Sequence, residues 1–185
     1  IEQGKTLAIL GRTGSGKTSV INLVARLFDA DSGDILIAGI PIKEVNLFDL
    51  RNSIGFVPQD AFLFSDTIRN NIKIGKEDAT DEEVIQAAKD AYIDHNIQEF
   101  SKKYDTLIGE RGVTLSGGQK QRISIARALI SEPKILIFDD CLSAVDTETE
   151  EIILNNLNRV REGKTTIIVS HRPSSVKNAD KIIVL

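Results

Sequence analysis

The stretch that decides the fold is GRTGSGKT, residues 11–18. The residues before it, TLAIL at positions 6–10, predict a buried strand, because all but the first are apolar. After it, apolar residues recur at helical spacing: Val20, Ile21, Val24, Leu27 and Phe28. Strand, glycine-rich turn and helix in this order predict a loop that binds phosphate groups.

Each fixed position of this loop has a chemical role. Small residues let backbone N–H groups wrap closely around a phosphate, and the start of the helix adds the positive end of its dipole. Lys17 can reach the terminal phosphates of a nucleotide, and the hydroxyl of Thr18 can bind Mg²⁺. The other positions contribute mainly backbone groups. The predicted phosphate-binding residues are Gly11, Arg12, Thr13, Gly14, Ser15, Gly16, Lys17 and Thr18.

An acidic position further along follows another apolar strand. ILIF at 135–138 predicts this strand, and we expect Asp139 at its end to hold Mg²⁺ through water. Short apolar strands that alternate with helices are typical of a parallel sheet covered on both faces. We therefore expect an α/β fold with a mainly parallel sheet flanked by helices, and with its ligands at the carboxyl ends of the strands. The other predicted elements are strands at 35–37, 54–57, 165–169 and 181–185, and helices at 80–91 and 147–161.

The composition suits a single globular domain. The chain has 185 residues, of which 41% are apolar and 27% charged. It has no Met and begins at Ile1, so we expect it to be a piece of a longer protein, with any membrane-spanning part outside it. The net charge of −4 and the lack of a basic block argue against nucleic acid as a partner. A single cysteine, Cys141, excludes an internal disulfide and agrees with a reducing compartment.

The stretch LSGGQKQR, residues 115–122, combines a helix start with a potential anion site. Ser116 and Gln119 have the spacing of a capping box. Gly117 and Gly118 would expose backbone N–H groups at the start of that helix. The stretch predicts either a well-capped helix alone or a second place where a phosphate is bound.

This stretch also resembles the signature motif of the ABC ATPase superfamily, and the resemblance covers essentially the whole chain. It implies a P-loop NTPase core, with ATP and Mg²⁺ as ligands. It also implies one domain, 1–185, with an inserted helical subdomain at about 61–130. Gln59 resembles the glutamine that contacts Mg²⁺ and senses the membrane part, and residues 143–146 resemble the D-loop. His171 resembles the histidine that contacts the γ-phosphate, whereas His95 lacks such a context and is expected at the surface.

The resemblance also implies partners. In that family two domains face head to tail, so Ser116, Gly117, Gly118 and Gln119 would bind the ATP held by a second nucleotide-binding domain. Residues 110–112, 60–64 and 67–72 resemble exporters, in which the region after the glutamine touches the membrane domain. This implies a transmembrane partner domain and a place at the cytoplasmic face of the cell membrane. The aromatic residue that stacks on adenine would lie before Ile1.

One position departs from the family pattern. Most active members have Glu directly after the Asp at position 139, whereas this chain has Asp140. A general base must reach the attacking water, and a misplacement of ~1 Å can cost ~100-fold in rate. We hypothesise that the site on this loop binds ATP and hydrolyses it slowly, as in one half of a heterodimeric exporter of the multidrug or lipid type. The alternative is that Asp140 acts adequately through a bridging water.

Three functions are consistent with these residues. The first is an exporter motor with Asp140, His171 and Gln59 as catalytic residues and Thr18, Gln59 and Asp139 as the Mg²⁺ site. The second is a mainly ATP-binding, regulatory half of a heterodimer. The third is a soluble ABC protein that acts on nucleic acid or chromosomes, which the acidic balance and the exporter-like residues 110–112 disfavour.

Overall fold

The computed structural model describes residues 1–109, 112–142, 145–160, 162–172 and 176–185. The chain divides into two compact units, which are described one at a time. Unit 1 consists of Ile1–Phe56, Pro133–Asp140 and Gly163–Leu185, and unit 2 consists of Val57–Glu132 and Cys141–Glu162. Glu110, Arg111, Ser143 and Ala144, which the exporter and D-loop predictions include, lie outside the described residues.

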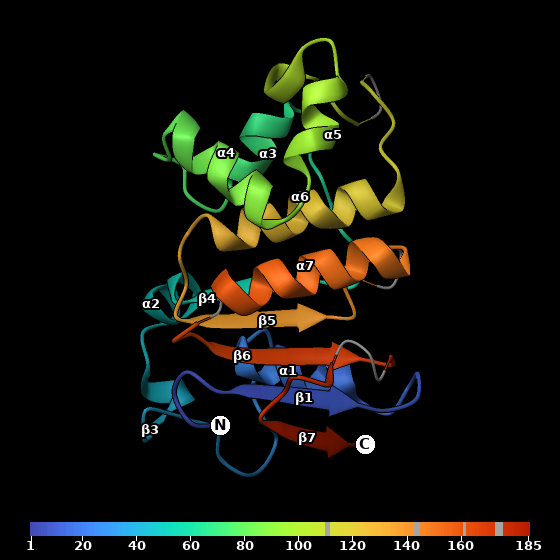
Figure 1. The fold of residues 1–185 in the computed structure, drawn as a ribbon. Helices are drawn as coiled ribbons and strands as arrows, with labels where there is room; N and C mark the ends of the chain where they lie inside the picture. The colour runs from blue at the N-terminus through green and yellow to red at the C-terminus, as the bar shows by residue number, and fades with distance from the viewer. Residues whose placement is uncertain (110–111, 143–144, 161, 173–175) are drawn as a thin grey trace. The chain divides into compact units, whose positions relative to one another are not determined.

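A five-stranded sheet forms the centre of unit 1, in the order β4-β5-β6-β1-β7. Its strands are β1 (Thr6–Leu10), β4 (Ile54–Val57), β5 (Ile135–Asp139), β6 (Thr165–Ser170) and β7 (Lys181–Val184). β1 runs parallel to β6 and β7, and β5 runs parallel to β6, so their arrows point the same way in Figure 1. Leu10 lies opposite Ser170 and Asp139 opposite Val169, so β1, β5 and β6 end at one edge of the sheet. The predicted α/β class with a mainly parallel sheet is confirmed.

Helix α1 (Lys17–Val24) packs against β5 and β6. The buried cluster beneath it joins one side chain of the helix to four from the strands: Ile9, Ile21, Ile137, Ile167 and Val169. The prediction that Leu27 and Phe28 continue the inner face of this helix is wrong, because they are 50% and 67% exposed. The helix has ended before them: Ala25 is its C-cap, and Arg26 has a left-handed φ of 49°.

The strand predicted at 35–37 is not part of the parallel sheet. Residues Leu36–Ile37 form β2, which pairs antiparallel with β3 (Ile40–Pro41) in a hairpin of its own. Ala38 and Gly39 both have positive φ, 52° and 80°, as a two-residue hairpin turn requires. An apolar run this short does not distinguish a hairpin from a central strand. The hairpin leads into η1 (Ile42–Glu44) and α2 (Leu47–Asn52).

Unit 2 is helical. It contains α3 (Ile68–Lys73), α4 (Asp81–Asp90), α5 (Asp94–Glu99), η2 (Lys103–Asp105), α6 (Gly117–Leu129) and α7 (Thr147–Val160). Helix α6 packs against α3 and α4, and α4 also packs against α5 and α7. Both α4 and α7 have a buried apolar face, with Val84, Ala88 and Ile153 fully enclosed. The subdomain boundaries of 61–130 stay a prediction.

None of the helices in the described part of the chain has both the length and the apolar character needed to cross a membrane.

Candidate functional site

The predicted phosphate loop joins the end of β1 to the start of α1 in unit 1. Gly14 and Gly16 have φ angles of 84° and 93°, a region that residues with a Cβ rarely adopt. A Cβ at either position would meet nothing within 4 Å, so glycine is required by the backbone angle and the space beside the loop stays open. Gly16 caps α1 without a side-chain hydrogen bond. The first turn of a helix leaves its amides without partners inside the helix, so the start of α1 fits a phosphate group.

Lys17 folds back over this loop. Its Nζ donates to the carbonyl oxygens of Gly11 and Arg12, both at 2.8 Å, and Ser15 N closes the turn by donating to Arg12 O at 3.1 Å. The ammonium thus lies at the loop. It has three N–H donors, so these two bonds do not exhaust its capacity.

Asp139 and Thr18 come together although they lie 121 positions apart in the sequence. The hydroxyl of Thr18 donates to Oδ2 of Asp139 at 3.0 Å. Asp139 is only 4% exposed, and this burial raises the pKa of its carboxyl, with the charge of Asp140 adding to the effect and Thr18 and Lys17 opposing it. A hydroxyl and a carboxylate oxygen at this distance are the hard ligands that Mg²⁺ prefers, so the pair fits that ion.

We expect Asp139→Asn to stabilise the nucleotide-free protein by about 1 kcal/mol, because it removes a buried negative charge and keeps an acceptor for Thr18. The same change should abolish the added stability that Mg²⁺ and a non-hydrolysable ATP analogue confer. Thermal unfolding of the full-length protein, with and without these ligands, measures both effects. Asp31→Asn, at an exposed position in the same unit, serves as the control. Undiminished stabilisation of the Asp139→Asn protein by Mg²⁺ and the analogue would contradict the assignment.

Asp140 and His171 form a pair at the same edge of the sheet. Asp140 directly follows β5, and its backbone N–H donates to Val169 O of β6 at 2.8 Å. Its φ of 43° is left-handed, which is a strained conformation for a residue other than glycine. Oδ2 of Asp140 lies 2.9 Å from Nδ1 of His171, which directly follows β6 and has a half-exposed side chain. The sequence indicated both residues, but only the structure pairs them.

The signature stretch lies in unit 2. The hydroxyl of Ser116 accepts from Gln119 N at 3.2 Å, and Oε1 of Gln119 accepts from Ser116 N at 2.9 Å. The predicted capping box is therefore present, and Gly117 and Gly118 form the first turn of α6. Gln59 lies in the same unit, as does Asp146, whose Oδ1 accepts from Thr149 N at 2.9 Å at the start of α7.

Comparisons with known proteins identify the family of the chain. The sequence profile of the ABC transporter family matches residues 1–143. The chain belongs to the ABC transporter family. It is 50% identical over its whole length to a probable multidrug resistance ABC transporter ATP-binding/permease protein of Bacillus subtilis (strain 168). It is 51% identical to a putative multidrug export ATP-binding/permease protein of Staphylococcus aureus (strain NCTC 8325 / PS 47). The chain spans only 32% of the length of either relative.

A solved structure shares the fold of this ABC domain. It is described as a bacterial Atm1-family ABC exporter with ATP bound. The two superpose with a TM-score of 0.95 at 46% sequence identity, over 98% of this chain and 32% of the other. The fold is therefore the P-loop NTPase core of the ABC type, and the chain is an ABC-type ATPase domain.

Sequence reasoning missed the contacts that two polar residues of α6 make with distant parts of the ABC domain. Arg127 on α6 donates to the carbonyl oxygens of Asn71 and Phe62, at 2.8 and 2.9 Å. Burial lowers the pKa of its guanidinium. Gln121, also on α6, donates from Nε2 to the carbonyl oxygen of Gln59 at 3.2 Å. Local sequence does not predict these contacts, because a polar side chain on a helix is most often exposed to solvent.

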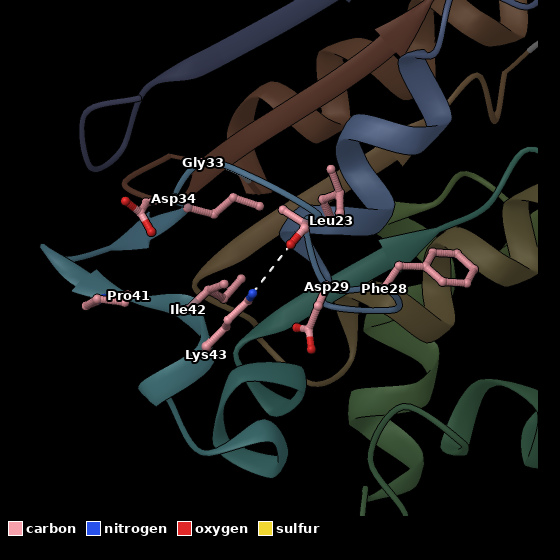
Figure 2. Close-up of a pocket in the computed structure, with 10 residues that line it drawn as sticks. Leu23, Phe28, Asp29, Gly33, Asp34, Pro41, Ile42 and Lys43 are labelled. Atoms are coloured by element: carbon pink, nitrogen blue, oxygen red, sulfur yellow. Dashed lines mark hydrogen bonds between the residues drawn. The ribbon is translucent and has the colours of Figure 1, made fainter.

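A hollow elsewhere in unit 1 contains none of the predicted site residues. It lies between the end of α1 and the β2–β3 hairpin, and Leu23, Phe28, Asp29 and Ile42 are among the residues that line it (Figure 2). Nζ of Lys43 donates to Ala30 O across it at 3.4 Å. The phosphate loop, with its open backbone, is the better candidate for nucleotide.

Proposed function

We propose that this chain is the ATP-binding and ATP-hydrolysing motor domain of an ABC exporter. The observation that carries the proposal is the meeting of the phosphate loop, Thr18, Asp139 and the Asp140–His171 pair at one edge of the sheet in unit 1. In phosphoryl transfer the protein supplies mainly positions and charges, and these residues are of the types that do so. The names of the relatives, multidrug export ATP-binding/permease proteins, support the direction of transport.

Each residue has a role in this proposal. Backbone N–H groups of the loop and the Lys17 ammonium bind the phosphates. Thr18 and Asp139 would hold Mg²⁺, and the bound ion would neutralise charge that develops on the phosphate oxygens. Asp140 orients the attacking water and accepts its proton. The contact with Asp140 holds the His171 ring in position, and His171 stabilises the γ-phosphate.

The signature stretch would act on the ATP of a second nucleotide-binding domain. Ser116, Gly117, Gly118 and Gln119 place a capped helix start at an exposed position of unit 2, where an anion from a partner can reach it. ATP would then be part of the interface between the two domains. If the partner is a copy of this chain, both ATP sites contain Asp140. If the partner is a different chain, its own ATP site can hydrolyse ATP faster than the proposed slow site at Asp140.

Helix α4 provides a matched control for a test of this role. Its Thr80 and Glu83 form the same capping box as Ser116 and Gln119, and Thr80 is exposed as Ser116 is. Loss of either cap should cost about 1 kcal/mol of stability. We expect Ser116→Ala also to lower ATP-dependent association of the nucleotide-binding domains about tenfold, whereas Thr80→Ala should leave it unchanged.

The measurement is ATP-dependent cross-linking or distance labelling between the two domains of the full-length protein. An equal loss of association in both variants would show that helix stability alone is responsible, and the proposed role of the signature would fail.

The loop after Gln59 is the surface that we assign to the transmembrane partner. Phe62 and Phe64 are 65% and 50% exposed, and their rings meet edge to face at 4.9 Å. Arg127 holds the backbone of Phe62 and lies over the ring of Phe64 at 5.9 Å. An exposed aromatic pair on an anchored loop is typical of a protein contact. This surface and the permease portions named in the relatives support a place at the cytoplasmic face of the cell membrane.

The second candidate function is a mainly ATP-binding, regulatory half of a heterodimer. Asp140 favours it, because its side chain is one methylene shorter than that of glutamate and its carboxylate already contacts His171. In that case ATP would hold the pair of domains closed while the partner's site performed most of the hydrolysis. Turnover with each site disabled in turn separates the two functions.

A further inference from the structure

Asn71 is a buried polar residue that the proposed mechanism does not use. It lies on α3 and is 0% exposed. Its Nδ2 donates to the carbonyl oxygens of Phe64 and Thr67, at 3.0 and 2.9 Å, and its Oδ1 accepts from Phe64 N at 2.8 Å. One side chain therefore binds both backbone polar groups of Phe64, seven positions earlier in the sequence.

The bonds of this amide use its full capacity. An asparagine side chain has two N–H donors and an oxygen with two lone pairs. Both donors bind carbonyl oxygens, while the oxygen accepts from Phe64 N and, at 3.0 Å, from Nη2 of Arg127. A backbone N–H and a guanidinium only donate, so these partners determine the orientation of the amide. Aspartate at this position would lose both donated bonds, and leucine would lose all four.

The loop that Asn71 binds carries the exposed aromatic pair. Residues 61–64 belong to no helix or strand, so bonds from outside the loop determine its path. Arg127 binds the backbone of Phe62, and Asn71 binds that of Phe64. Exposed aromatic rings lose the stabilisation that burial gives, so a loop without these anchors is expected to turn its rings inward. The anchored backbone therefore favours the conformation in which both rings are exposed.

We infer that Asn71 is the positioning residue for the surface that docks the transmembrane partner. This inference rests on the proposed function, because it takes the role of Phe62 and Phe64 from there. Asn71 is fully buried, so it acts through the loop and not by touching the partner. Its loss would spread the loop over several conformations, of which the partner fits only one, and docking would weaken by that fraction. The nucleotide site in unit 1 would keep its affinity.

The experiment uses the full-length protein in membrane vesicles, with photoreactive benzoylphenylalanine in place of Phe62. Mass spectrometry measures the fraction of position 62 that cross-links to the membrane portion. Asn71→Asp keeps the size of the side chain and its accepted bonds and removes the donated ones. We expect this variant to lower cross-linking about tenfold, as the loss of two neutral hydrogen bonds can do. Asn71→Leu should lower it at least as much.

Asn96→Asp is the matched control. Asn96 lies on α5, which packs against α4 and η2, and its side-chain oxygen is buried. The variant therefore makes the same chemical change in unit 2 at a residue outside the loop. We expect it to cross-link as the unchanged protein does. Thermal unfolding and the affinity for a non-hydrolysable ATP analogue show whether each variant remains folded.

Hydrogen exchange tests the same bond without a change at position 71. In the unchanged protein the amide of Phe64 should exchange slowly, although its side chain is half exposed, because Oδ1 of Asn71 accepts its hydrogen. Fast exchange of this amide would overturn the inference even if neither Asn71 variant folds.

The cross-linking outcomes separate the inference from the proposed function. Asn71 variants that cross-link as fully as Asn96→Asp would overturn the inference and leave the docking surface in place. An equal loss in all three variants would attribute the effect to the stability of unit 2, which also overturns it. If position 62 of the otherwise unchanged protein does not cross-link to the membrane portion, the proposed docking surface itself is wrong.

Discussion

Lys17→Ala is expected to weaken ATP binding about 100-fold and to abolish measurable hydrolysis. Charge-assisted bonds to phosphate contribute about 1.5–3 kcal/mol each, and about 2.7 kcal/mol corresponds to 100-fold in affinity. In the structure the ammonium also bridges the carbonyl oxygens of Gly11 and Arg12. Its removal would therefore loosen the loop in addition to removing a phosphate contact.

The affinity can be measured by calorimetric titration of the full-length protein with an ATP analogue that is not hydrolysed. Lys43→Ala is the control, because Lys43 lies in the same unit and its ammonium also donates to a backbone carbonyl, that of Ala30. We expect that control to bind nucleotide normally. Unaltered affinity of the Lys17→Ala protein would remove the basis of the proposed function.

Asp140→Glu is expected to raise turnover at this chain's own site by up to ~100-fold, the factor that a misplacement of about 1 Å can cost. The added methylene would bring the carboxylate closer to the attacking water. Asp140 has a left-handed φ of 43°, and its backbone N–H is bonded to Val169 O of β6, so the backbone is not free to compensate for the shorter side chain. Steady-state ATPase activity of the full-length protein, with any second site disabled, is the measurement.

Two further variants make this test decisive. Asp140→Asn keeps the size of the side chain and removes its basicity, so it should lower the remaining turnover. His171→Ala, made with both Asp and Glu at position 140, shows whether the 2.9 Å contact between these residues matters for each. If Asp140→Glu and the unchanged protein turn over equally fast, Asp140 acts through a bridging water and the slow-site hypothesis is wrong.

The elements that could be predicted from sequence are those that are determined by residues close together in the chain. The turn at Gly14 and Gly16 depends on backbone angles that glycine adopts readily. The capping box of Ser116 and Gln119 closes within four consecutive residues. The hairpin at Ala38 and Gly39 was missed because an apolar run of three residues fits a central strand equally well.

The sequence by itself determined the phosphate loop, the strands of the parallel sheet, the capped helix of the signature and the departure at Asp140. The loop, the strands and the capped helix follow from residues that are close together in the sequence, and the departure at Asp140 is a single residue type. Only the tertiary structure decided that Thr18 meets Asp139, that Asp140 contacts His171, and that Gln121 holds Gln59. These partners are 121, 31 and 62 positions apart. Their meeting depends on strand order and helix packing, which bring distant segments together and leave no periodic trace in the local sequence.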